Sequence, residues 1–134
     1  MAPEIFPQRK LRGAAAGPGE QRYFEAAAEG KLLLRQCGAC GQHHHYPRSM
    51  CPFCLSDDVH WVQASGTGTV YTFSVTRRGV EIPYCIAYVT LDEGITMMTN
   101  IVDCDLDAVR IGQRVRVVFK TTDNGMAMPL FTPG

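Results

Sequence analysis

Residues 37–54 read CGACGQHHHYPRSMCPFC, and this stretch decides the fold. It holds two Cys-x-x-Cys pairs, Cys37 with Cys40 and Cys51 with Cys54, separated by ten residues. A two-residue gap lets both sulfurs of a pair reach one ion, so two such pairs predict a tetrahedral site of four thiolates. Thiolates are soft ligands that favour Zn2+, with iron in a rubredoxin-like site as the second choice. We therefore predict a metal-stabilised ribbon, with redox thiols or disulfides as the less favoured alternative.

The predicted metal site is structural rather than catalytic. Four protein ligands leave no open position for water or substrate, which disfavours Lewis-acid chemistry. The run His43, His44 and His45 could supply a competing nitrogen ligand, but we favour an exposed loop or short strand, because four sulfurs already complete the shell. Gly41 and Leu55 each follow one cysteine pair, at a position that often needs a positive φ. We expect modest strain at Leu55, or a different path of the chain there.

Length and composition set the outer bounds. The 134 residues suffice for one ordinary domain, or for two small ones if a metal replaces part of a core. The formal net charge is zero, which argues against a protein that coats nucleic acid but allows a local basic groove. No apolar run approaches the length of a membrane span, and residues 1–30 lack the apolar segment of a signal peptide. Cys85 and Cys104 are lone thiols, so we expect a protein of the reducing cytoplasm.

The chain divides into four segments. Residues 1–19 are rich in Pro, Gly and Ala, which predicts a flexible tail. A helix is expected over residues 20–31, with Gly30 as its C-terminal cap. We expect the zinc ribbon over residues 32–62 and a separate β domain over residues 63–134.

The last segment shows the two-residue period of β-strands. Tyr71, Phe73 and Val75 alternate with polar residues, which predicts one buried face. Residues 84–91 are apolar on both faces, which predicts a central strand or one covered by a partner. Pro129 in the final strand suits a sheet edge. The expected strands cover residues 71–76, 84–91, 95–102, 114–120 and 126–131. Five short antiparallel strands with a helical turn after the third predict a small OB-fold barrel. The fold class is thus mainly β, with an N-terminal helix, a rubredoxin-like zinc ribbon and a five-stranded barrel.

The order of several motifs matches a known protein family. The chain reads YFEAAAEGKLLLRQCGACG over 23–41, IPYCIAYVTLDEG over 82–94 and RIGQRVRVVF over 110–119. Over about residues 20–134 it resembles the bacterial and archaeal zinc-ribbon/OB-fold proteins that accompany thiolase-like enzymes. The resemblance implies a small subunit of an acyl-CoA-processing complex, whose partner is a thiolase, an acyltransferase or an aldolase of thiolase fold. The positions that carry over are the metal ligands Cys37, Cys40, Cys51 and Cys54.

A search for a catalytic set within the chain finds none. Cys104 lies between two aspartates, whose charges raise the pKa of a thiol and disfavour the nucleophilic thiolate. Cys85 sits in an apolar strand and is expected to be inert core. We interpret His60, beside Trp61, as a packed histidine rather than a general base, because no neighbour in the sequence orients it.

The leading hypothesis is therefore a non-catalytic subunit of an acyl-CoA-processing complex. A thiolase-fold partner would provide the reacting groups, and this chain would support the partner's stability and acyl-CoA binding. Candidate contacts for the phosphates of coenzyme A are Arg48, Arg77 and Arg78. Candidate contacts for the partner are Tyr23, Phe24, Tyr84, Ile86 and Tyr88.

Two other functions stay open at this point. OB barrels and zinc ribbons bind single-stranded nucleic acid, and Tyr71 and Phe73 could be stacking platforms. The neutral net charge disfavours this alternative. Electron transfer through a four-thiolate iron is the third hypothesis.

Overall fold

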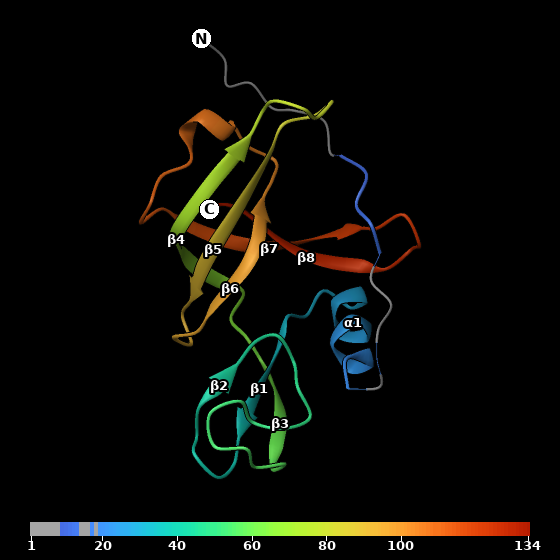
Figure 1. The fold of residues 1–134 in the computed structure, drawn as a ribbon, viewed down its shortest axis with the longest axis vertical. Coiled ribbons are helices and arrows are strands. Elements are labelled where there is room, and N and C mark those ends of the chain that lie inside the picture. Colours follow the sequence, from blue (N-terminus) through green and yellow to red (C-terminus); the bar gives the residue numbers. More distant parts are fainter. Residues whose placement is uncertain (1–8, 14–16, 18) are drawn as a thin grey trace.

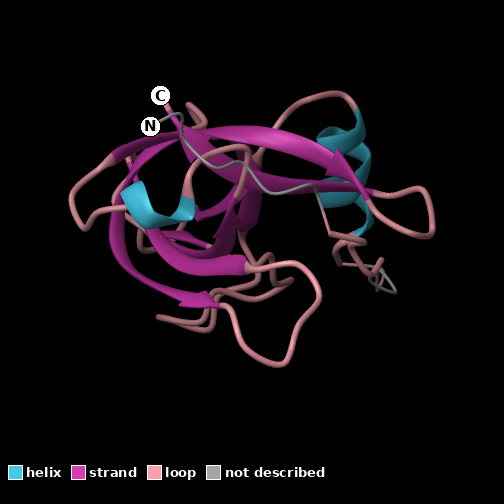
Figure 2. Cartoon of the chain, turned by 90° about the horizontal axis from the view of Figure 1, so that it is seen from above, coloured by secondary structure: helices cyan, strands magenta, loops and turns pink. Residues whose placement is uncertain are grey.

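The structure has two parts, a small three-stranded ribbon and a five-stranded barrel, with one helix beside them (Figure 1). This computed structural model describes residues 9–13, 17 and 19–134. Seen from above, helix α1 (Gln21–Ala28) lies at one side of the barrel (Figure 2). Within the described ranges, no helix combines the length and the apolar character needed to cross a membrane. The predicted fold class, mainly β with one N-terminal helix, is confirmed.

Helix α1 lies within the range that the sequence predicts. Gly30 follows it with a φ of +78°, a conformation that glycine adopts without strain. Tyr23 and Phe24 on its apolar side are buried and belong to the same core cluster as Leu34 of the ribbon and Phe131 of the barrel. The helix, the base of the ribbon and the barrel therefore share one hydrophobic core.

The ribbon is an antiparallel sheet of strands β1 (Leu33–Cys37), β2 (His43–His44) and β3 (Val59–Gln63), in the order β2-β1-β3. The ladder between β1 and β3 pairs Leu33 with Gln63 at one end and Cys37 with Val59 at the other. Both cysteine pairs lie at the end of this sheet that is farther from the barrel (Figure 1). The sheet thus fixes the first pair directly, through Cys37.

The barrel consists of strands β4 (Thr67–Thr76), β5 (Tyr84–Leu91), β6 (Thr96–Ile101), β7 (Arg114–Thr121) and β8 (Ala127–Pro133). It closes in the order β4-β5-β6-β8-β7, and a 3-10 turn, η1 (Leu106–Ala108), follows the third of these strands. This topology confirms the predicted OB fold. Strand β8 pairs with β6 only at Phe131, so Pro129 has a strand partner on one side alone, Phe119 of β7.

One expectation for β4 is wrong. The pairing of β4 with β5 shifts between Val70 and Thr72, which is a β-bulge. The bulge turns Tyr71 outward, where 66% of it is exposed, while Val70 is buried. Phe73 and Val75 pack against the core as predicted. The alternation in the sequence therefore misplaces one residue, because a bulge changes the two-residue period.

Strand β5 is buried on one face only. Cys85, Ala87, Val89 and Leu91 point into the core, each at most 2% exposed. On the opposite face Ile86 and Tyr88 are exposed to solvent (38% and 45%, respectively). Of the two predicted explanations for this doubly apolar strand, a fully covered central strand is wrong for the isolated chain.

Part of the expected tail lies against the barrel. Leu11 is 8% exposed, and its carbonyl oxygen accepts the N–H of Asp123 at 2.7 Å. The N–H of Gly13 donates to the Asp123 carboxylate at 2.8 Å, and the Arg9 guanidinium stacks on the ring of Tyr84 at 4.1 Å. The prediction of a flexible tail over residues 1–19 therefore does not hold for residues 9–13. The predicted docking peptide at residues 5 and 6 lies outside the described residues.

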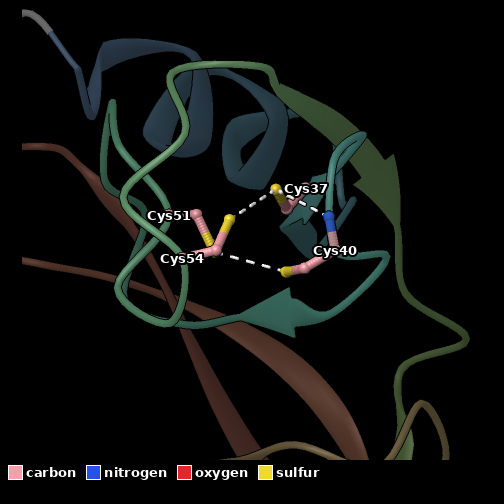
Figure 3. A group of neighbouring side chains, drawn as sticks. All are labelled: Cys37, Cys40, Cys51 and Cys54. Carbon is pink, nitrogen blue, oxygen red and sulfur yellow. Dashed lines mark hydrogen bonds between the residues drawn. The ribbon is translucent and has the colours of Figure 1, made fainter.

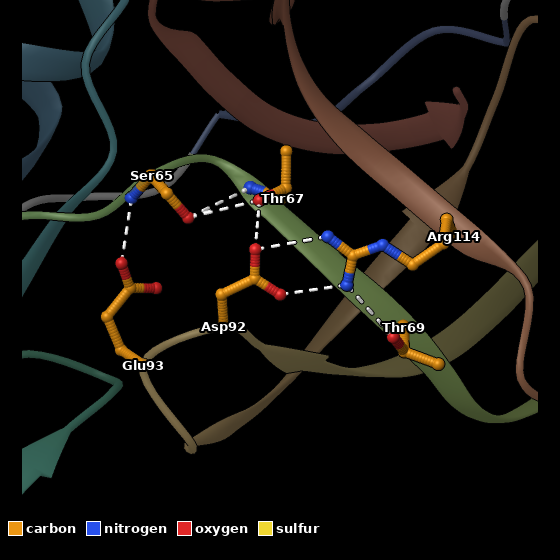
Figure 4. Close-up of polar contacts among 6 residues, drawn as sticks. All are labelled: Ser65, Thr67, Thr69, Asp92, Glu93 and Arg114. Carbon is orange, nitrogen blue, oxygen red and sulfur yellow. Dashed lines mark hydrogen bonds and ion pairs between the residues drawn. The ribbon is translucent and has the colours of Figure 1, made fainter.

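A cluster of polar residues joins the ribbon to the barrel (Figure 4). Arg114 on β7 binds both carboxylate oxygens of Asp92, at 2.8 and 3.1 Å, and the Thr67 hydroxyl donates to the same carboxylate. In the linker, the N–H of Ser65 donates to the Glu93 carboxylate at 2.8 Å. This polar cluster holds the linker against the hairpin turn between β5 and β6. It thereby fixes the ribbon relative to the barrel.

Candidate metal centre and surrounding surfaces

The fold brings the four predicted cysteines together (Figure 3). All four sulfur atoms lie within 4.8 Å of one another. The sulfurs of Cys37 and Cys54 are 3.5 Å apart, and those of Cys40 and Cys51 are 3.7 Å apart. A tetrahedral ion with metal–sulfur bonds of about 2.3 Å requires sulfurs about 3.8 Å apart. Both the donor set and the spacing therefore fit one metal ion.

The two cysteine turns repeat the same backbone pattern. The N–H of Gly41 donates to the carbonyl of Cys37, and the N–H of Leu55 donates to the carbonyl of Cys51, each at 2.9 Å. Within the first turn the N–H of Cys40 points at the sulfur of Cys37 at 3.4 Å. This hydrogen bond lowers the pKa of the Cys37 thiol to about 6, which favours the thiolate that a metal needs.

The equivalent positions Gly41 and Leu55 both have a positive φ, +78° and +67°. This conformation suits glycine and costs a leucine about 1–2 kcal/mol. Of the two possibilities that the sequence left open, strain rather than a different chain path is the one that the structure has. The Leu55 side chain is 70% exposed, so packing does not offset the strain.

The histidine run lies outside the cysteine cluster. His43 and His44 form the short strand β2, as expected, but His44 is buried and accepts the backbone N–H of Arg48 at 3.3 Å. The Tyr23 hydroxyl bonds to Nε2 of His45 at 2.9 Å, and burial lowers the pKa of His45 to about 4. The expectation of an exposed run is therefore wrong. These side chains build the loop between the two cysteine pairs.

The three candidate arginines do not form one phosphate site. Arg48 lines an open groove of about 590 Å3 between the ribbon and the β5–β6 turn, together with His43, Phe53 and Glu93. Arg77 and Arg78 follow β4, at the end of the barrel away from the ribbon (Figure 1), and Arg77 pairs with Asp107. A single phosphate group therefore cannot bind all three arginines. Only the groove at Arg48 combines a cation with space for a ligand.

The candidate partner contacts are also separated. Tyr23 and Phe24 are 3% and 8% exposed, so their rings pack in the protein's own core and are not available to a partner. Tyr84 is half-buried under Arg9. Ile86 and Tyr88 remain exposed. Sequence reasoning missed two further exposed apolar residues on this face, Tyr71 because of the bulge, and Met98 because it adjoins the equally apolar Met97.

No nucleophile–base pair is found among the described residues. Burial raises the pKa of Cys104, and the neighbouring aspartates raise it further, as the sequence predicts. Cys85 is fully buried, and desolvation raises its pKa to about 11. The prediction of a packed His60 is wrong, because its ring is exposed and lies 2.7 Å from the Asp58 carboxylate. Neither thiol contacts a histidine.

The cysteine turns and the barrel topology define a zinc-ribbon and OB-fold protein, and family models agree. The model of the ChsH2 rubredoxin-like zinc ribbon domain matches residues 24–60, and that of the ChsH2 C-terminal OB-fold domain matches residues 61–120. The solved structure titled Ltp2-ChsH2(DUF35) aldolase is 34% identical, with a TM-score of 0.78, over 90% of this chain and 98% of that one. The chain belongs to the DUF35 family.

Curated relatives with higher and lower coverage give a consistent picture. A probable enoyl-CoA hydratase alpha subunit of Thermomonospora curvata is 36% identical over 83% of this chain and 36% of its own length. The benzoylsuccinyl-CoA thiolase subunit BbsA of Geobacter metallireducens is 31% identical over 61% of this chain and 57% of its own. The chain thus spans about a third to somewhat over half of these relatives. All three names refer to multi-subunit or paired enzymes rather than to an isolated chain of this size.

Proposed function

We propose that this protein is a non-catalytic subunit of an acyl-CoA-processing enzyme, in which a thiolase-fold partner provides the reacting groups. The observation that carries the proposal is the closed set of four sulfurs, which leaves no ligand position for substrate. The relatives named as a thiolase subunit and as part of an aldolase support the kind of partner. The exposed Ile86 and Tyr88 support a contact through the barrel.

The metal in this proposal is zinc. Four thiolates suit zinc or iron, and the match to a zinc-ribbon model favours zinc. When bound, the ion would cross-link the two cysteine turns. Elemental analysis of freshly purified protein should give about one zinc per chain, and a reddish protein rich in iron would contradict this choice and favour electron transfer.

The groove at Arg48 is the proposed contact for the nucleotide end of coenzyme A. Its volume of about 590 Å3 lies within the range of ligand sites, about 300–1,000 Å3. Arg48 supplies a cation for phosphate, and Phe53, which is 58% exposed, supplies an aromatic face for adenine. Titration calorimetry with coenzyme A should show binding that Arg48→Ala weakens and that Arg78→Ala, at the other end of the barrel, leaves unchanged.

Reconstitution tests the function itself. The tagged protein, purified from its source organism, should retain a thiolase-fold chain. Alone, it should show no thiolytic, acyl-transfer or retro-aldol turnover of acyl-CoA, and the partner should restore turnover. Turnover by the isolated chain that is lost on mutating His60 or Cys104 would contradict the proposal.

The nucleic-acid alternative makes a different prediction. A neutral chain should bind a generic single strand no tighter than about 10 µM at physiological salt. A salt-sensitive, submicromolar complex with an oligonucleotide would reverse the ranking of the two functions.

A further inference from the structure

The outer face of the barrel carries a stripe of exposed apolar side chains. It consists of Tyr71 on β4, Ile86 and Tyr88 on β5, and Met98 on β6, and we call it the apolar stripe. Tyr88 is the direct cross-strand partner of Met98, so the two side chains lie side by side. Tyr71 and Met98 are the most exposed, at 66% and 62%.

The stripe is not the result of a loosely packed barrel. The same strand β5 buries Cys85 and Val89 completely on its inner face, so the sheet is well packed beneath the stripe. Monomeric proteins seldom expose several large apolar side chains on adjacent strands without a partner. A separate exposed leucine-type side chain, Ile111, stands alone on a turn and needs no such explanation.

A basic segment borders the stripe. Residues 9–12 form one wall of a trough of about 470 Å3 whose floor includes Ile86 and Met98, so the trough and the stripe are continuous. Arg9, Lys10 and Arg12 lie on this wall, and none of the described residues that line the trough carries a carboxylate. Leu11 anchors the segment, because its side chain is buried and its carbonyl is bonded to Asp123.

We propose that the apolar stripe and the basic segment together form the docking surface for the thiolase-fold partner, which presents an apolar patch edged by carboxylates. This inference rests on the proposed function. The choice of occupant follows from the charge of the rim and from its continuity with a broad sheet face. Tyrosines and a methionine on a flat, desolvatable surface are typical of a protein interface rather than of a small-molecule site, which is concave and has convergent polar groups.

The two components of the surface should act differently on binding. Apolar anchors near the centre of an interface mainly slow dissociation of the complex. Charges at the rim mainly speed association and lose their effect as salt screens them. Met98 belongs to the first group, and Lys10 and Arg12 belong to the second.

The experiment uses the thiolase-fold chain that co-purifies with the tagged protein, and measures its association and dissociation rates on immobilised variants. Met98→Glu should weaken the complex about tenfold or more, chiefly through faster dissociation. Lys10→Glu with Arg12→Glu should slow association severalfold at low salt and much less at about 0.5 M salt. Ile111→Glu and Arg78→Glu are the matched controls and should leave both rates unchanged. Metal content and strand content must equal those of the wild type in every variant.

Three outcomes separate the possibilities. An unchanged affinity for Met98→Glu, or a loss confined to Phe53→Glu on the second cysteine turn, overturns this docking surface and leaves the proposed function intact. Equal effects of the charge reversals at low and high salt overturn the role of the basic segment. Absence of any thiolase-fold chain from the purified protein overturns the proposed function and this inference together.

Discussion

The ribbon and the barrel are stabilised by different means. Between residues 37 and 62 the buried residues are two of the metal-site cysteines, His44 and Pro47. The barrel instead buries a continuous set of apolar side chains, from Val70 on β4 to Phe131 on β8. A segment with so few buried side chains needs a metal or covalent link to stay folded, whereas hydrophobic burial alone supports the barrel. Loss of the metal and loss of the core should therefore unfold different parts of the protein.

The largest expected effect is that of Cys51→Ser. Loss of one ligand should release the metal, and with it a binding free energy that reaches about 10 kcal/mol or more in zinc-finger peptides. The ribbon should unfold while the barrel keeps its strands. Hydrogen exchange should show loss of protection over residues 37–62 alone. Cys85→Ser, at a buried barrel cysteine outside the site, is the control and should keep the metal. Collapse of the whole chain in Cys51→Ser would show that the barrel also depends on the metal.

The second effect tests the barrel from its own side. Phe131 is fully buried, and Phe131→Ala should lower the free energy of unfolding by about 3–5 kcal/mol, because it leaves a cavity in the core. Denaturant unfolding followed by far-ultraviolet circular dichroism measures the change. Phe53→Ala removes an equal side chain from an exposed position on the ribbon and should cost less than about 0.5 kcal/mol. Similar losses for both variants would contradict the contrast between the two regions.

A smaller effect is confined to the ribbon. Leu55→Gly should remove the strain of a leucine at φ +67° and stabilise the ribbon by about 0.5–1 kcal/mol, after the higher chain entropy of glycine is subtracted. Gly41→Ala is the reciprocal change at the equivalent position, where a side chain has free space, and should destabilise the ribbon through φ alone. Native-state hydrogen exchange over residues 37–62 measures both variants. A Leu55→Gly ribbon less protected than the wild type would mean that the exposed leucine makes a contact worth more than its strain.

The smallest effect concerns the joint between the two regions. The hydrogen bonds from Arg114, and then from Thr67, lower the pKa of Asp92 to about 2, below about 3.9 in an unfolded chain. A lowered pKa means that the contribution of Asp92 to stability is present above about pH 4 and is lost as the pH falls through about 2. Asp92→Asn should therefore melt at a slightly lower temperature than the wild type at pH 7, and the difference should vanish near pH 2. Metal release in acid affects both proteins alike. A difference that persists at pH 2 would show that the ion pair is not its cause.

Local patterns in the chain predicted much of the fold. The spacing of the cysteines predicted the four-sulfur cluster, and the turn at residues 92–94 and the strand periods predicted the barrel. Leu55 was singled out as a strained position by comparison with Gly41, and both have a positive φ. These features depend on residues near one another in the sequence, so their cause is visible in the sequence.

The errors have a common origin. Tyr71 was expected in the core, but a bulge in its pairing with another strand turned it outward. Tyr23 and Phe24 were expected at an interface, but the barrel covers them. Arg48 was grouped with Arg77 because of chemistry alone, although the chain places them at opposite ends of the barrel. In each case the deciding neighbour lies far away in the sequence.

The sequence by itself determined the metal ligands, the order of the elements and the barrel, because ligand spacing, turn residues and side-chain period act within a few residues. Only the tertiary structure decided which apolar side chains face solvent and where the basic residues 9–12 lie. Burial is a property of the packed chain, since a side chain is covered by whatever long-range pairing brings against it. For that reason the apolar stripe and its basic border emerge only once β4, β5, β6 and the N-terminal segment are placed side by side.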